Sequence, residues 1–369
     1  MGPKLILGRS GAMGHDLPGH PETAARALAI EKALAKANLT QETSGGLVRD
    51  VSRGSGRTED EVRDTILAVH SPALFGGMRK LSADLAPDGV MNLDIDTYCT
   101  PTSFADLVKA VSVVCDLVDE VVASSSASSS STPPSGFGLV RPPGHHAVPS
   151  GPMGFCIFNT VSAAVRYAQR AHGFRRVTVF DFDVHHGNGT QDIFYDDPDV
   201  QYLSTHQEGA FPGTGKTWEL GGEGAVGATL NVPLPPGSGH EAALLSWEAI
   251  VDPAIRRHRP EIIFVSAGFD AHWKDPQAGC QYQSSTFHAL SKRIRALAEE
   301  VAECGGRVVY VLEGGYDLGA LGDSVAEACR GLVGLPSDPR EDTDALYDPP
   351  SKRIEEAIEA ASERARDFL

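Results

Sequence analysis

Ionisable side chains at regular spacing follow a strongly apolar run near the middle of the chain. Asp181, Asp183 and His185 are two residues apart, directly after the β-branched and aromatic residues 176–180. Such a run is typical of a buried parallel strand, and residues two apart along a strand share one face. Carboxylate and imidazole ligands suit zinc, which leaves a position open for water at catalytic sites. The alternative is that polar residues merely end a strand, but the Asp-x-Asp-x-His-His pattern favours a metal site.

Two further apolar runs end in polar residues in the same way. One ends at Asp270, and the other ends in a glycine-rich turn followed by Tyr316. Ligands bind at the carboxyl ends of the strands in open α/β sheets, so these ends should converge on one crevice. We therefore expect Asp183, His185 and Asp270, called the metal triad below, to form a three-ligand zinc site.

Paired histidines on a proline-braced loop are candidate proton-transfer groups. His145 and His146 follow the short apolar strand 138–140 and an Arg-Pro-Pro-Gly turn. A single histidine is more often structural than catalytic. Two adjacent ones, in a chain that also holds Asp181 and Asn188 as candidate orienting partners, favour general acid–base catalysis.

Six motifs, in the same order along the chain, resemble those of the histone deacetylase family of zinc hydrolases. They are Arg-Pro-Pro-Gly-His-His at 141–146, Gly-Phe-Cys-x-Phe-Asn at 154–159, Asp-x-Asp-x-His-His-Gly-Asn-Gly at 181–189, Phe-Pro-Gly-Thr-Gly at 211–215, Ala-Gly-Phe-Asp at 267–270 and Leu-Glu-Gly-Gly-Tyr at 312–316. A looser similarity runs from Gly19 to about residue 335. Asn188, where class I members carry Asp, and the Leu-Glu-Gly-Gly-Tyr form are similar to class II members and to the related acetylpolyamine, bacterial and organellar amidohydrolases.

The resemblance implies a role for each polar residue of the site. Zinc held by the metal triad would activate a water molecule for attack on an acetamide carbonyl. His146, paired with Asn188, would take the proton of this water and later protonate the departing amine. His145, oriented by Asp181, would be its electrostatic partner, and the Tyr316 hydroxyl would help to hold the developing oxyanion.

A second cation is implied by the resemblance alone. The family binds potassium near the zinc, which in this chain would involve Asp181, Asp183 and the backbone around Ser204 and Thr205. A hard cation with oxygen ligands fits that set. The expected cofactors are therefore one zinc ion per chain and, beside it, potassium.

The substrate-binding residues are also implied by the resemblance. Phe155 and Phe211, with Gly154, fall where the family lines a narrow tunnel for the aliphatic stem of an acyl-lysine. The alternative is that both phenylalanines are core residues. Asp96 takes the place of a rim residue that contacts substrate, although it also fits a solvated loop acid. Gln277 takes a rim position that is commonly Leu in protein deacetylases and acidic in the polyamine-selective branch, so neither specificity is indicated there.

These motifs must be positioned by a single sheet. The length of 369 residues would allow more than one domain, but the site motifs come from 141–316, and a sheet built from all of them cannot be divided. Strands and helices alternate, as in strand 177–180, helix 242–255 and strand 262–265. This alternation predicts an α/β fold with an open, mostly parallel sheet and helices on both faces. We expect one domain, of the kind that arginase and deacetylases share, over 1–369.

Two segments lie outside this alternation. The serine-rich tract 123–135 is too polar and too simple in composition to build a core, and it predicts a mobile surface loop. In the last segment, 350–369, Ile354 and Ile358 are four residues apart, which predicts a terminal amphipathic helix. A solvated acidic tail is the alternative there.

The net charge of −17 restricts the kinds of partner to expect, and the six cysteines restrict the cellular compartment. Nucleic-acid binding needs a basic stripe and is not expected, whereas an acidic rim would attract cationic substrates. The cysteines lack Cys-x-x-Cys spacing, which indicates reduced thiols in a cytoplasm, or in a chloroplast or mitochondrion if a transit peptide has been trimmed. No run reaches the roughly 20 apolar residues of a membrane span, so no membrane partner is expected. The oligomeric state stays open.

Two classes of function remain. The first is an amidohydrolase that removes acetyl groups from protein lysines or from a small amine, such as an acetylpolyamine or an N-acetyl arylalkylamine. The second is a catalytically idle, zinc-bound module that binds acyl-lysine. Tyr316 and the intact histidine pair favour the enzyme. A dimanganese, arginase-like hydrolase fits less well, because the chain carries Asp-x-Asp-x-His-His rather than Asp-x-His-x-Asp.

Overall fold

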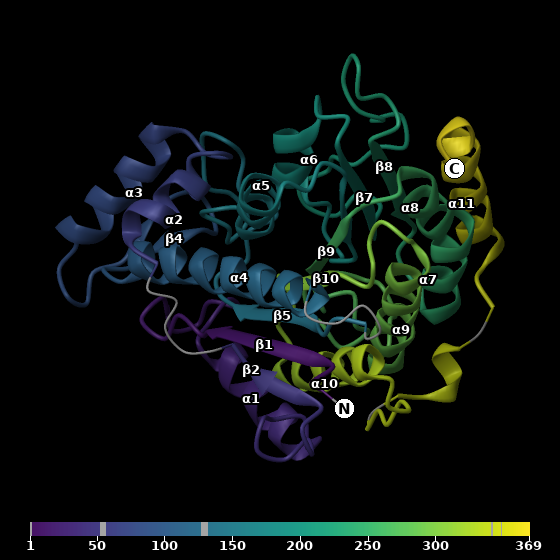
Figure 1. Cartoon of the computed structure of the whole chain (residues 1–369), viewed down its shortest axis with the longest axis horizontal. Coiled ribbons are helices and arrows are strands. Elements are labelled where there is room, and N and C mark those ends of the chain that lie inside the picture. Colours follow the sequence, from purple (N-terminus) through teal and green to yellow (C-terminus); the bar gives the residue numbers. More distant parts are fainter. Residues whose placement is uncertain (1, 52–56, 127–131, 341, 348) are drawn as a thin grey trace.

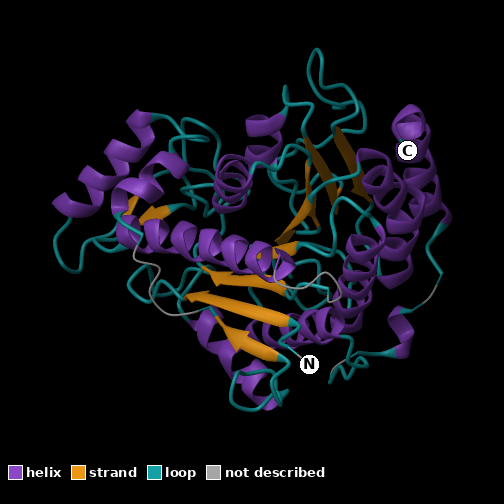
Figure 2. Cartoon of the chain, in the orientation of Figure 1, coloured by secondary structure: helices purple, strands orange, loops and turns teal. Residues whose placement is uncertain are grey.

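Eight parallel strands form one sheet in the part of the chain that the structure, a computed structural model, describes: residues 2–51, 57–126, 132–340, 342–347 and 349–369 (Figures 1 and 2). The strand order is β2-β1-β5-β10-β9-β6-β7-β8. The strands are β1 (Leu5–Ser10), β2 (Val48–Asp50), β5 (Ser135–Val140), β6 (Val177–Asp181), β7 (Val200–Gln207), β8 (Thr229–Leu234), β9 (Ile262–Ala267) and β10 (Val308–Leu312). A short antiparallel ribbon pairs β3 (Met91–Asn92) with β4 (Tyr98–Cys99).

Helices cover both faces of the sheet (Figure 1). The α-helices are α1 (Ala25–Lys36), α2 (Glu59–Ile66), α3 (Pro72–Asp84), α4 (Ser103–Ser126), α5 (Thr160–His172), α6 (Asn188–Phe194), α7 (His240–Ser246), α8 (Asp252–His258), α9 (Ser284–Glu300), α10 (Leu318–Val333) and α11 (Lys352–Ala365). The shorter helical segments are a π-helical turn, η1 (Trp247–Val251), and two 3-10 turns, η2 (Asp344–Leu346) and η3 (Arg366–Phe368). None of the described helices has both the length and the apolar composition needed to cross a bilayer.

Successive residues of the central strands pack into different layers. In β9, Ile262 and Phe264 belong to the apolar cluster under α4 and α5, whereas Ile263 and Val265 belong to the cluster under α1, α9 and α10. Both faces of the strand are therefore buried, which explains its unbroken apolar sequence. The arrangement confirms the predicted α/β fold, with a parallel sheet between two layers of helices.

The sheet order places the strands that carry the polar motifs side by side. β5, β10, β9 and β6 are consecutive neighbours, and their pairings are all parallel. Their carboxyl ends therefore lie at one edge of the sheet. The residues that follow each strand meet there although they are far apart in sequence.

Helix α4 corrects the expectation of a surface loop over 123–135. The helix continues to Ser126, and the buried strand β5 already begins at Ser135. The hydroxyl groups of Ser124 and Ser125 donate to the carbonyls of Glu120 and Val121, one turn earlier, so these polar residues are accommodated within the helix. Residues 127–131 lie outside the described part of the chain.

Of two other helical segments, one differs in detail from the sequence-based expectation and the other agrees with it. The helix expected over 242–255 is divided into α7, η1 and α8. In the C-terminal segment 350–369, α11 buries Ile354 and Ile358 against the core. The four-residue spacing of these isoleucines therefore marks the packed face of the helix.

Candidate active site

The three residues of the metal triad meet at the carboxyl ends of β6 and β9. One ligand atom from each of Asp183, His185 and Asp270 lies within 4.8 Å of the other two. The Nδ1 atom of His185 is 3.1 Å from Asp183 Oδ1 and 3.2 Å from Asp270 Oδ2. Both carboxylates are buried, and His185 lines the cavity described below, so the triad is a polar site at the edge of the sheet that is open on the histidine side.

The chemistry of this donor set fits a bound cation. Asp270 Oδ2 is buried and lies 3.2 Å from His185 Nδ1, which also faces Asp183 Oδ1 at 3.1 Å. Two buried carboxylates therefore share one imidazole, which leaves negative charge that a cation would compensate. Although burial lowers the pKa of His185, the two facing carboxylates raise it well above its ordinary value of 6.5. A proton would therefore take the place of the cation when no metal ion is bound.

Two glycines allow the carboxylates to approach the neighbouring strands. A Cβ atom at Gly268 would lie 1.9 Å from Asp183 Oδ2, and one at Gly314 would lie 2.0 Å from Asp270 Oδ2. The backbone N–H of Gly314 donates to Asp183 Oδ2 at 2.9 Å, and that of Val184 donates to Asp270 Oδ1 at 3.0 Å. The backbone N–H of His185 also donates to Asp183 Oδ1, at 2.9 Å. Backbone amides thus fix both oxygens of Asp183 and one oxygen of Asp270.

The paired histidines lie beside the triad, each with the partner expected from the sequence. His145 Nδ1 is 3.0 Å from Asp181 Oδ2, and His146 Nδ1 is 2.8 Å from Asn188 Oδ1. Burial lowers the pKa of His145, but the Asp181 and Asp183 carboxylates raise it to about 10. Burial and the neighbouring His145 lower the pKa of His146 well below 6.5. The surroundings therefore favour the protonated form of His145 and the neutral form of His146.

Glu313 supports the histidine loop from below, a role that the sequence analysis did not assign. This fully buried carboxylate accepts hydrogen bonds from the backbone N–H groups of Gly144, at 2.6 Å, and His145, at 3.1 Å. The burial raises the pKa of Glu313 to about 7. Glu313 could be noticed in the sequence as the glutamate of the Leu-Glu-Gly-Gly-Tyr motif, but nothing in that motif indicates that it binds the histidine loop.

Tyr316 follows β10 and is half-buried above the triad. The Arg26 guanidinium lies 4.9 Å from the centre of its ring and donates to the carbonyls of Glu313 and Gly315. Burial raises the pKa of Tyr316 well above 10, so its hydroxyl stays protonated and is available as a hydrogen-bond donor.

A cavity of about 100 Å³ leads to these groups. Its lining is formed by Asp96, Pro143, His145, His146, Gly154, Phe155, His185, Phe211, Gln277 and Tyr316. The ring of Phe155 meets that of Tyr316 edge to face at 5.5 Å, and the ring of Phe211 meets that of His146 at 5.0 Å. Phe211 is 40% exposed, which places it at the mouth of the cavity rather than in the core.

Asp96 and Gln277 are far apart in the sequence but line the same cavity. Asp96 is half-buried, and its backbone carbonyl accepts a hydrogen bond from His20 Nε2 at 2.9 Å. Burial and the nearby Asp94 carboxylate raise the pKa of Asp96. Gln277 is exposed and contributes an uncharged amide. The structure thus brings together every site residue expected from the sequence.

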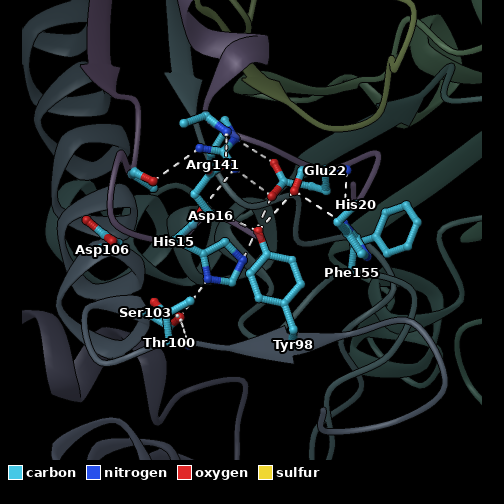
Figure 3. Close-up of polar contacts among 12 residues, drawn as sticks. His15, Asp16, His20, Glu22, Tyr98, Thr100, Ser103, Asp106, Arg141 and Phe155 are labelled. Carbon is cyan, nitrogen blue, oxygen red and sulfur yellow. Dashed lines mark hydrogen bonds and ion pairs between the residues drawn. The ribbon is translucent and has the colours of Figure 1, made fainter. Parts of the chain in front are cut away.

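A buried ionic cluster ties the N-terminal segment to the histidine loop (Figure 3). Arg141 donates to both oxygens of Glu22, at 2.6 and 2.7 Å, and Arg26 donates to Oε1 at 3.0 Å. The Tyr98 hydroxyl donates to the backbone carbonyl of Glu22, and the Tyr98 ring stacks on that of His15. Burial alone would raise the pKa of Glu22, but the two guanidinium groups lower it to about 2. The sequence by itself did not indicate that Glu22 and Arg141 form an ion pair.

Comparisons with known proteins find related sequences over nearly the whole chain. A sequence profile for the histone deacetylase domain matches residues 20–332. The chain is 46% identical over 361 residues to histone deacetylase 10, chloroplastic, of Oryza sativa subsp. japonica, covering 97% of this chain and 80% of that protein. It is 45% identical over 362 residues to histone deacetylase 14, chloroplastic, of Arabidopsis thaliana, covering 97% of this chain and 84% of that protein.

The fold is similar to that of a solved structure, the crystal structure of the HDA15 HD domain. The TM-score is 0.83 at 28% sequence identity. The match covers 100% of this chain and 95% of that chain.

Replacing a member of the metal triad should remove the bound metal together with the activity. We expect purified Asp270→Ala protein to lose metal, because three protein ligands leave none to spare. Metal content per chain, measured by mass spectrometry of the purified protein, checks this. Asp192→Ala, which removes an exposed carboxylate on α6, serves as the control and should retain the metal. Stoichiometric metal in the Asp270 variant would contradict the ligand assignment.

Glu22→Gln should destabilise the fold, because it leaves two buried guanidinium groups without their anion. We expect the free energy of unfolding in urea to fall by about 3 kcal/mol or more. Glu31→Gln, the control, removes a 44% exposed partner of Arg9 and should cost less than about 1 kcal/mol.

The same cluster predicts a pH dependence. The pKa of Glu22 is lower in the folded chain, about 2, than its ordinary value of 4.5. The cluster therefore stabilises the protein above pH 4.5, and this contribution is lost as the pH falls toward about 2. The difference in unfolding free energy between wild type and Glu22→Gln should shrink over that range. A difference that does not change with pH would contradict the assignment.

Proposed function

Because this chain belongs to the histone deacetylase family, we propose that it is a zinc-dependent deacetylase that hydrolyses an N-acetyl amide. The observation that carries the proposal is the convergence of the metal triad, the histidine pair and Tyr316 on one narrow cavity. A bound acetyl group would have a metal site, a base and a hydroxyl donor within reach at the same time.

Zinc held by the metal triad would polarise the acetyl carbonyl and lower the pKa of a water molecule. Asp183, His185 and Asp270 supply the mixed oxygen and nitrogen set that zinc accepts, and two buried carboxylates that face one imidazole support a cation at this place. Potassium near Asp181 and the backbone of Ser204 stays a prediction.

His146 is the group that we propose takes the proton from water. Asn188 Oδ1 accepts a hydrogen bond from Nδ1 of His146, which leaves Nε2 of the neutral ring free to bind a proton. The low pKa of His146 keeps the ring neutral before the reaction. After the proton transfer, the same Nε2 proton is available for the departing amine.

His145 and Tyr316 would stabilise charge without exchanging a proton with water. His145 donates from Nδ1 to Asp181, and its raised pKa keeps a positive charge beside the reacting groups. The Tyr316 hydroxyl would donate to the carbonyl oxygen as negative charge develops on it. Such a hydrogen bond stabilises the transition state most when the donor is already in place before the reaction.

The substrate that we propose is an acetylated lysine in a protein or a small N-acetylated amine. A cavity of about 100 Å³ between Phe155 and Phe211 suits a single aliphatic stem. The rim carries Asp96 but no second charge at Gln277, so an acetylpolyamine or an N-acetyl arylalkylamine, hydrolysed with little protein deacetylase activity, is the alternative. For the compartment we propose a chloroplast, since both plant relatives are named chloroplastic.

A comparative assay tests the function. Purified protein loaded with zinc is offered an acetyl-lysine peptide, an acetylpolyamine and an N-acetylated arylalkylamine, and released acetate is measured. We expect turnover of at least one of them, abolished by a chelator. Tight binding of the acetyl-lysine peptide without any acetate release would favour the non-catalytic binding module.

Tyr316→Phe should lower kcat by on the order of a hundredfold while zinc content and fold are kept, because it removes a donor used mainly in the transition state. Steady-state kinetics on the best substrate and metal analysis measure this. Tyr195→Phe, at the end of α6, removes the hydroxyl of another half-buried tyrosine and is the control. A Tyr316 variant within threefold of wild type would remove the tyrosine from the mechanism.

Exchanging Gln277 should change substrate preference. Glu at this exposed rim position should favour a cationic acetylpolyamine over an acetyl-lysine peptide, and Leu should do the reverse. The expected change in relative kcat/KM is about tenfold, at unchanged zinc content. If the ratio of kcat/KM for the acetylpolyamine to that for the peptide is the same in wild type and both variants, position 277 does not contact the substrate.

A further inference from the structure

Asp275 is a buried carboxylate in the loop between β9 and α9, and it lies outside the cavity lining. Its Oδ2 atom accepts hydrogen bonds from the backbone N–H groups of Tyr316, at 2.6 Å, and Asp317, at 3.1 Å. Its Oδ1 atom accepts from the backbone N–H of Gln277 at 3.0 Å. One side chain therefore holds the loop of the candidate catalytic tyrosine and the loop of the candidate rim residue.

We propose that Asp275 is a positioning residue that sets the Tyr316 hydroxyl for catalysis and holds the rim at Gln277 in register with it. The inference rests on the proposed deacetylase function. Asp275 acts through the backbone of Tyr316 and does not touch the substrate.

The loop that carries Tyr316 depends on contacts of this kind. Gly314 and Gly315 precede the tyrosine, and Gly315 has a φ of +120°, so the chain before it is not restrained by side-chain sterics. Arg26 holds the carbonyls of Glu313 and Gly315 on one side. Asp275 holds the amides that follow, directly before α10 begins. Removing Asp275 would release the backbone amides of Tyr316 and Asp317, and with them the position of the tyrosine relative to the rim.

A carboxylate is the side chain that these three amides require. Each oxygen accepts without donating, so both loops are bound at once. The isosteric Asn has a single acceptor oxygen, and its NH2 group would face an amide N–H of one loop. Because a hydroxyl displaced by a fraction of an ångström no longer meets the oxyanion well, Asp275→Asn should lower the rate of the chemical step.

The experiment is a double-mutant cycle between Asp275→Asn and Tyr316→Phe, with kcat and KM measured on the best substrate of the zinc-loaded protein. We expect Asp275→Asn to lower kcat at least thirtyfold in the wild-type background, with a smaller change in KM. In the Tyr316→Phe background the same substitution should lower kcat by less than threefold, because the hydroxyl through which it acts is already gone. Equal losses in the two backgrounds would overturn the proposal and leave Asp275 with a structural role.

Glu261→Gln is the matched control. The Glu261 carboxylate also accepts two backbone N–H groups, those of Arg175 and Arg176, but at the opposite edge of the sheet. Its exchange should lower the melting temperature without changing kcat. A loss of kcat in Glu261→Gln as large as that in Asp275→Asn would show that general destabilisation explains both, and would overturn the proposal.

The starting activity separates this inference from the proposed function. Wild-type protein that hydrolyses none of the three acetylated substrates would contradict the function, and the positioning role with it. Active wild-type protein with additive losses in the cycle would contradict the role of Asp275 alone. Zinc content is measured for each variant, and an Asp275→Asn protein that has lost its zinc would assign the residue to the metal site instead.

Discussion

Two buried carboxylates face one imidazole at the edge of a parallel sheet, and this arrangement governs the rest of the site. Asp183 and Asp270 can be buried together only where backbone amides and a cation compensate their charge. That requirement explains Gly268 and Gly314, since a side chain at either position would occupy the space of a carboxylate oxygen. It also explains why the triad stands where parallel strands end, because free backbone N–H groups are available there.

Charge compensation extends outward from the metal triad in layers. The histidine pair lies between Asp181 and Asn188. Although burial opposes it, the Asp181 carboxylate raises the pKa of His145, whereas burial and the neighbouring His145 lower the pKa of His146. Beneath them, Glu313 holds the backbone of the histidine loop. Farther out, the cluster around Glu22 fixes the N-terminal segment against that loop (Figure 3). Each layer holds the one inside it through hydrogen bonds between buried groups, which suits the proton transfer that we propose.

The rim of the cavity is built differently from its floor. Phe211 and Gln277 are exposed and come from long connections, that between β7 and β8 and that between β9 and α9, where substitutions disturb the fold least. Asp275 lies between these two regions and contacts the loops of both the rim and Tyr316. We infer that substrate preference is adjustable at the rim as long as such buried links keep the catalytic groups in position.

The sequence by itself determined the parallel α/β fold, the metal triad and the histidine pair, because strand periodicity and motif spacing are local patterns that place polar groups at strand ends. Only the tertiary structure decided which distant groups support them. Glu313 contacts a loop 168 positions earlier, and Arg26 contacts Gly315 across 289 positions. The serine-rich tract, expected as a loop, partly continues α4. In each case the outcome depends on which strands and helices become neighbours, and that order is fixed by the packing of the whole sheet rather than by any local stretch of residues.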